Sequence, residues 1–115
     1  MYYLSWCFEY TVDENNRTRE IVSNIRLGEA YKYSNQYERA FIYFDKALYL
    51  CETHQIHGYE DFALQHKGKC FMELEMFSEA EDCFERALDI REKKGNQSLI
   101  DSTQQAIDLV KKLHH

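Results

Sequence analysis

The sequence predicts an all-α protein in which two helical hairpins stack side by side. The first observation is an internal repeat with an offset of forty residues, which is typical of stacked helical units. The second is the absence of proline and the presence of only four glycines among 115 residues, which disfavours strands joined by tight turns. The third is the helical spacing of apolar residues in each copy. The matching pairs are Leu27 and Lys67, Gly28 and Gly68, Tyr31 and Phe71, Ala40 and Ala80, Phe44 and Phe84, and Ala47 and Ala87.

Apolar residues at steps of three and four, together with end signals, predict where the main helices lie. We expect Thr18 to cap the first of them. Ser78 is followed three residues later by Glu81, which matches the capping box, so a helix is expected to begin at Ser78. Gly95 follows two lysines and is expected to end that helix. The predicted helices span 19–34, 37–54, 61–74, 78–94 and 96–113.

The chain is predicted to form one domain with a cover at each end of the repeats. The aromatic stretch 2–10 is expected to form a short helix, and the polar residues 12–17 are expected to link it to the first repeat. The last helix carries polar residues on its outer face, as a capping helix requires. The expected divisions are 1–17 for the N-terminal aromatic segment and link, 18–56 for repeat 1, 57–95 for repeat 2 and 96–115 for the capping helix.

Composition and motifs disfavour several classes of function. The net charge is −6 without a block of basic residues, whereas nucleic acid and acidic membrane surfaces both attract a basic face. No apolar run reaches the roughly 18 residues of a membrane span. The sequence has no GxSxG motif and no glycine-rich phosphate loop. We therefore expect a protein that is not an enzyme, needs no cofactor, and binds neither nucleic acid nor membrane.

The cysteines indicate reduced, buried thiols and a cytoplasmic protein, because none forms a CxxC pair and no export signal is recognisable. One alternative is a metal site, since thiolate and imidazole are good zinc ligands. Its candidates, Cys51, His54 and His57, lie at steps of three, with His66 as the fourth ligand that a closed site would need. Polar packing between the repeats is the preferred interpretation of this group, and no metal is expected.

The repeated residues resemble the signature of the tetratricopeptide repeat family, over roughly residues 20–95. The resemblance rests on Leu27-Gly28-x-x-Tyr31, followed by Ala40, Phe44 and Ala47, and on its second copy, which departs at Lys67. It implies a right-handed superhelix of helix pairs. The forty-residue spacing is similar to the extended subfamily, which includes kinesin light chain, spindle-orientation adaptors and bacterial peptide-sensing regulators.

The resemblance also implies a protein- or peptide-binding groove along the first helix of each repeat. Some members clamp a terminal carboxylate with Lys and Asn at two groove positions, but Ile25 and Glu29 occupy those positions here. The alternative for any single groove residue is a merely solvated position. The candidate groove residues are Val22, Ile25, Arg26, Glu29, Tyr33, Phe62, Gln65, His66, Lys69 and Glu73.

An interaction module is thus the leading prediction, and two other roles remain open. One is a regulatory peptide sensor, in which a bound peptide shifts an attached or partner regulator. The other is a homodimer that buries the aromatic N-terminal end, because that end carries more large apolar groups than a short helix can hide. These rings could instead pack on the first repeat. The expected interface residues are Tyr2, Tyr3, Trp6, Phe8 and Tyr10.

Overall fold

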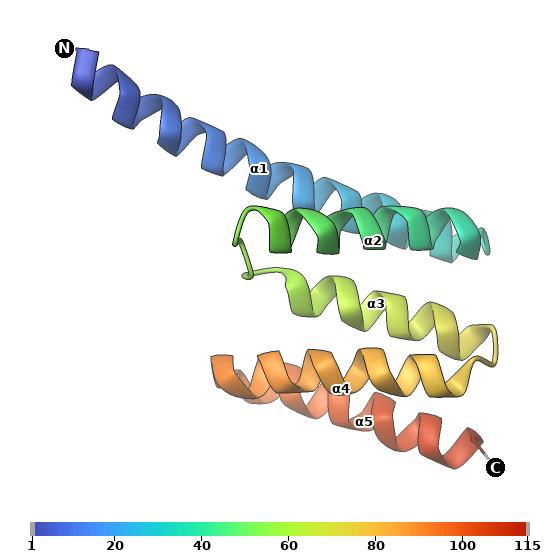
Figure 1. The fold of residues 1–115 in the computed structure, drawn as a ribbon. Helices are drawn as coiled ribbons and strands as arrows, with labels where there is room; N and C mark the ends of the chain where they lie inside the picture. Colours follow the sequence, from blue (N-terminus) through green and yellow to red (C-terminus); the bar gives the residue numbers. More distant parts are fainter. Residues whose placement is uncertain (1, 115) are drawn as a thin grey trace.

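The computed structural model describes the backbone of residues 2–114 and the side chains of residues 15–114. Within this range the chain is entirely helical apart from turns, and consecutive helices run antiparallel to one another (Figure 1). The predicted all-α class is therefore confirmed, together with the sequential packing of helix on helix. The helices are α1 (Tyr2–Tyr33), α2 (Tyr37–Thr53), α3 (Glu60–Glu73), α4 (Phe77–Lys94) and α5 (Gln97–Leu113).

Each hairpin closes on a contact between a glycine and a phenylalanine ring. A Cβ added to Gly28 of α1 would lie 2.4 Å from the ring of Phe44 on α2, and one added to Gly68 of α3 would lie 2.7 Å from the ring of Phe84 on α4. Both rings are fully buried. Glycine is the residue that lets two helices approach this closely. The two glycines have equivalent surroundings, as the forty-residue offset predicts.

The turns inside the two hairpins are equivalent as well. Asn35 and Glu75 both adopt a left-handed backbone conformation, with φ of 61° at each. In both turns the next amide donates a hydrogen bond of 2.8 Å to a carbonyl oxygen near the end of the preceding helix. Asparagine tolerates this conformation better than glutamate does. The backbone therefore repeats even where the residue type changes.

The repeats are joined through α3, which packs on α2 of the first hairpin as well as on α4 of its own. Ala63 and Cys70 of α3 belong to the core cluster of the first repeat, and the Phe41 and Phe71 rings lie 4.6 Å apart between α2 and α3. At the other end, α5 covers the second repeat, as predicted. The second cluster consists of Ala80 and Phe84 from α4 with Ile107 and Val110 from α5.

The structure corrects three predictions about helix ends. The expected link at 12–17 is wrong, because α1 is continuous from Tyr2 to Tyr33 and its first part extends beyond the other helices (Figure 1). The link residues are polar but include no glycine or proline that would end a helix. Thr18 consequently lies inside α1 and is not its cap. Ser78 does not cap α4, because that helix begins at Phe77 after Met76.

Two other end signals act as helix boundaries. Gly95 is the C-cap of α4, with a left-handed φ of 76°, and its amide donates to the carbonyl oxygen of Arg91 at 3.0 Å. Asn96 is the N-cap of α5, because its side chain accepts a hydrogen bond of 3.2 Å from the amide of Leu99. The sharp turn between α4 and α5 follows from these two adjacent caps.

We predict that Gly28→Ala and Gly68→Ala will each lower the free energy of unfolding by about 2 kcal/mol, because the new methyl group overlaps a buried ring. Gly58→Ala is the control, since a Cβ there meets nothing within 4 Å. It should change stability by less than about 0.5 kcal/mol. Urea denaturation of the three variants measures the difference, and equal stability of all three would contradict the packing role of the two glycines.

Candidate functional site

The candidate groove lies along α1 and α3, which run in the same direction (Figure 1). An interaction between Glu29 Oε1 and His66 Nε2, 3.1 Å apart, joins the two helices directly. The structure therefore brings together candidate groove residues from two different repeats. We call the surface formed by the exposed and half-buried groove residues the inner face; its members are Val22, Arg26, Glu29 and Tyr33 of α1 and Phe62, His66, Lys69 and Glu73 of α3.

Two of the ten predicted groove residues lie in the interior. Ile25 is 6% exposed and belongs to the core of the first repeat, and Gln65 is 4% exposed and accepts a hydrogen bond of 3.0 Å from Thr103 of α5. These two residues are equivalent by the forty-residue offset, so the same row of the helix turns inward in both repeats. Neither can form part of the open surface.

The exposed members of the inner face differ in chemistry. Tyr33 is 75% exposed and lies beside Lys32, whose ammonium is 4.9 Å from the ring centroid. Arg26 is also exposed. Glu73 accepts a hydrogen bond of 2.8 Å from the Tyr37 hydroxyl, so its carboxylate already has a partner. An exposed aromatic ring, an exposed guanidinium and a partnered carboxylate thus share one surface.

His66 is held in its neutral form. Burial, together with the nearby charges of Lys32 and Lys69, lowers its pKa to about 4. Glu29 favours the charged imidazole, but burial and the lysines outweigh this single carboxylate. The neutral ring can donate its Nε2–H to Glu29, while Nδ1 is buried without a hydrogen-bond partner among the described residues. The ring also stacks at 5.9 Å on Phe44, which anchors it to the core.

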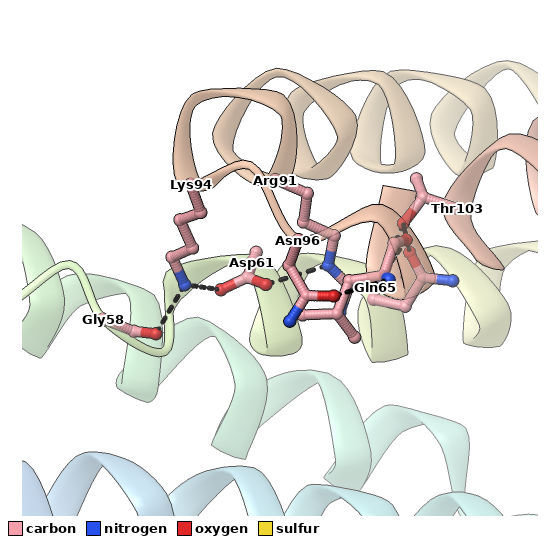
Figure 2. Close-up of polar contacts among 8 residues, drawn as sticks. Gly58, Asp61, Gln65, Arg91, Lys94, Asn96 and Thr103 are labelled. Carbon is pink, nitrogen blue, oxygen red and sulfur yellow. Dashed lines mark hydrogen bonds and ion pairs between the residues drawn. The ribbon is translucent and has the colours of Figure 1, made fainter. Parts of the chain in front are cut away.

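A buried polar network joins α3, α4 and α5 behind this surface (Figure 2). Arg91 Nε donates to Asp61 Oδ2 at 2.8 Å, and Arg91 Nη1 donates to the Thr103 hydroxyl at 2.7 Å. Lys94 Nζ donates to Asp61 Oδ1 and to the Gly58 carbonyl oxygen, each at 2.7 Å. Asp61 is fully buried and Arg91 is 2% exposed. The network fixes the position of α5 relative to α3.

Our sequence interpretation did not include this network, although the repeat offset carries its signal. Asp61 and Arg91 correspond to Ile21 and Cys51 of the first repeat, and all four residues are buried. The second repeat has therefore replaced a pair of apolar core residues with an ion pair. Charged residues at inward-facing positions of both helices of one repeat indicate that they meet.

The structure does not assemble the metal candidates into a ligand set. Cys51 is buried in the core, and burial raises the pKa of its thiol to about 11. His57 Nδ1 lies 2.9 Å from Glu60, and His54 is the C-cap of α2. Within residues 15–114, no group of three potential ligands is close enough to hold a metal ion. Cys70 and Cys83 are also free and buried, in agreement with the predicted structural role of these thiols.

The predicted dimer interface falls on side chains outside the described residues. Tyr2, Tyr3, Trp6, Phe8 and Tyr10 all belong to the first part of α1, and self-association through them stays a prediction. Among the helices described, none combines the length and hydropathy needed to span a membrane.

Comparison with known proteins identifies one family. The family model described as tetratricopeptide repeat matches residues 18–93, which includes both hairpins. Neither curated proteins nor solved structures gave a significant match. The matched region contains all ten residues of the candidate groove.

We predict that Arg91→Cys will destabilise the protein by about 3 kcal/mol, because it removes one of the partners of a buried carboxylate. The double variant Asp61→Ile with Arg91→Cys installs the equivalent residues of the first repeat and should recover at least about half of that loss. Chemical denaturation measures both. Lys93→Ala is the control, because its pair with Asp89 is exposed on both sides, and it should change stability by less than about 0.5 kcal/mol. No recovery in the double variant would contradict this role.

We also predict that acidification destabilises the protein through His66. Its folded-state pKa of about 4 lies below the ordinary 6.5, so the unfolded chain binds more protons as the pH falls. The stabilisation is complete above about pH 6.5, and about 2 kcal/mol of it is lost by about pH 5. Denaturation curves at about pH 7.5 and 5 measure this loss. His66→Gln should reduce it, whereas the half-exposed His57→Gln should not; equal pH dependence in both variants would refute the assignment.

Proposed function

Because the chain belongs to the tetratricopeptide repeat family, we propose that it is a non-enzymatic module that binds a segment of a protein partner along the inner face. The observation that carries this proposal is the mixed chemistry of that face. Exposed aromatic area at Tyr33 lies among charged groups of both signs contributed by two adjacent parallel helices. Such a surface suits an extended or helical peptide, with apolar anchors for affinity and charges for register.

The finer assignment within the family is the extended repeat type. Its support is the offset of forty, which recurs in the glycine–phenylalanine contacts and in the left-handed turn residues Asn35 and Glu75. The free, buried thiols are compatible with a reducing compartment, so we assign the protein to the cytoplasm. Within this proposal the partner is a protein, and the module contributes binding and no chemistry.

The projecting part of α1 favours a second candidate role, self-association. That part extends beyond the other helices (Figure 1), and its sequence carries six large apolar residues between positions 2 and 10. A second copy could bury them in a symmetric pair. Sedimentation of the protein at tens of micromolar tests this role. A dimer that dissociates when Trp6 and Phe8 are replaced by serine would support it, and a monomer would exclude it.

We predict that Arg26→Glu combined with Lys69→Glu will abolish partner capture without loss of helix content. Both substitutions reverse charge on the inner face, one on α1 and one on α3. The control is Lys46→Glu with Arg86→Glu, which makes the same charge change at exposed, repeat-equivalent positions on α2 and α4. The measurement is affinity capture from the native lysate with quantitative mass spectrometry, together with circular dichroism of each variant.

The two double variants separate the possible outcomes. Partners retained by wild type and by the control, but lost from the inner-face variant, would support the proposal. Partners retained by all three proteins, or lost from both variants, would reject the inner face as the binding surface. Recovery of only further copies of this chain would favour self-association.

A further inference from the structure

We propose that a second copy of this chain covers the outer edge of the first hairpin with the first part of its own α1. The pairing is reciprocal, so each copy both donates and receives a helix. This inference rests on the second candidate role, self-association, and names the surface that receives the projecting helix. We call that surface the first-hairpin edge; it is formed by Ser23, Leu27 and Tyr31 of α1 and by Arg39 and Tyr43 of α2.

The second hairpin shows what lies on the equivalent edge within the stack. The Phe71 ring, which corresponds to Tyr31 by the forty-residue offset, lies 4.6 Å from the ring of Phe41 on α2. Lys67 on the same edge pairs with Asp45 of α2 at 2.6 Å. The edge of the second hairpin is therefore covered by a helix, namely α2.

The first-hairpin edge has no such cover within residues 15–114. In that range α1 packs on α2 and on α3, and these two helices leave its remaining side open. Leu27 is accordingly 44% exposed. The rings of Tyr31 and Tyr43 stack 5.4 Å apart, and the Arg39 guanidinium lies 5.8 Å from the centroid of the Tyr31 ring. A leucine and two stacked tyrosines thus form an open apolar surface beside one cation.

The uncovered edge is more apolar than the covered one. Leu27 occupies the position at which the covered edge carries Lys67, and Tyr43 places a large ring where the covered edge has the small Cys83. An edge that faces water is expected to be the more polar of the two. The reversal indicates that the first-hairpin edge is itself covered by another helix.

The projecting part of α1 is suited to be that helix, but only in a second copy. It extends beyond the other helices (Figure 1), and its sequence carries six large apolar residues between positions 2 and 10. Because α1 is one continuous helix, this part cannot turn back onto its own edge. In a two-fold pair with antiparallel α1 helices, it lies along the edge of the other copy, and the same contact forms twice.

Length and charge both fit this arrangement. At 1.5 Å per residue, α1 is about 18 Å long from residue 20 to residue 31 and about 20 Å long from residue 2 to residue 14. Positions 2–14 include three acidic residues and no lysine, arginine or histidine. Arg39 on the receiving edge forms no ion pair with a carboxylate among the described residues. Opposite charges therefore favour the docking.

The first test is sedimentation velocity of the whole chain at tens of micromolar, where the wild type is expected to be a dimer. Leu27→Lys installs the residue of the covered edge and should weaken pairing at least about tenfold, because it places a cation in an apolar contact. Leu109→Lys is the matched control. Leu109 is also 44% exposed but belongs to α5, so this variant should pair as the wild type does. Circular dichroism should give the same helix content for all three proteins.

The second test mixes two defective variants. Trp6→Ser with Phe8→Ser impairs the donated helix and keeps the edge, whereas Leu27→Lys impairs the edge and keeps the donated helix. Each variant alone is expected to be monomeric where the wild type pairs. The equimolar mixture should form a heterodimer, because one of the two reciprocal contacts is intact. A fluorescent label on one variant detects this heterodimer in sedimentation.

Several results would overturn the pairing. These are a monomeric wild type, an equal effect of Leu27→Lys and Leu109→Lys, or a mixture in which no heterodimer forms. Pairing that depends on Trp6 and Phe8 but not on Leu27 means that the rings meet one another, so self-association stands and the edge fails. A monomer whose Leu27→Lys variant loses a different protein in lysate capture assigns the edge to that protein instead. Binding along the inner face is decided separately by the Arg26→Glu, Lys69→Glu variant.

Discussion

The distance between the two helices of each hairpin is set by a phenylalanine ring that packs directly on a glycine. Because Gly28 and Gly68 have no side chain, Phe44 and Phe84 can be buried completely between their helices. The packing of one hairpin on the next starts from this close spacing of the two helices. This spacing brings Ala40 and its repeat equivalent into the core and leaves α3 free to pack on α2. The functional consequence is indirect: close hairpins allow α1 and α3 to lie side by side and form one surface.

The same backbone supports two different interiors. In the first repeat Ile21 and Cys51 belong to one apolar core cluster, whereas in the second Asp61 and Arg91 form an ion pair. The ion pair has additional donors in Lys94 and an additional acceptor in Thr103, which supply the hydrogen bonds that buried charges need. Hydrogen bonds are directional, and apolar contacts are not. The hydrogen-bonded network around Asp61 and Arg91 therefore restricts the orientation of α5 more strongly than the apolar residues Ile21 and Cys51 restrict the helices around them. Such a restriction suits α5, which is the last helix of the stack.

Some charged side chains of the inner face have a hydrogen-bond or ion-pair partner within the protein, and others do not. Glu29 and His66 form a bridge within the protein, and Glu73 is occupied by Tyr37. Lys69 forms no ion pair with a carboxylate among the described residues, and burial lowers the pKa of its ammonium. Within the proposed function, the charges left unpaired are the ones that a bound peptide can meet.

The amino-acid sequence by itself determined the repeat, the number of helices in each hairpin and the inward-facing apolar rows, because these depend on local periodicity and on the forty-residue offset. Eight of the ten groove residues that it predicted are exposed or half-buried and form the inner face. Tertiary structure alone decided which buried polar groups meet and which surface residues lack a partner. The continuity of α1 belongs to the same category, since polar residues at 12–17 are compatible with either a link or a helix. The physical reason is that helix formation is governed by neighbours in sequence, whereas pairing of charges is governed by neighbours in space.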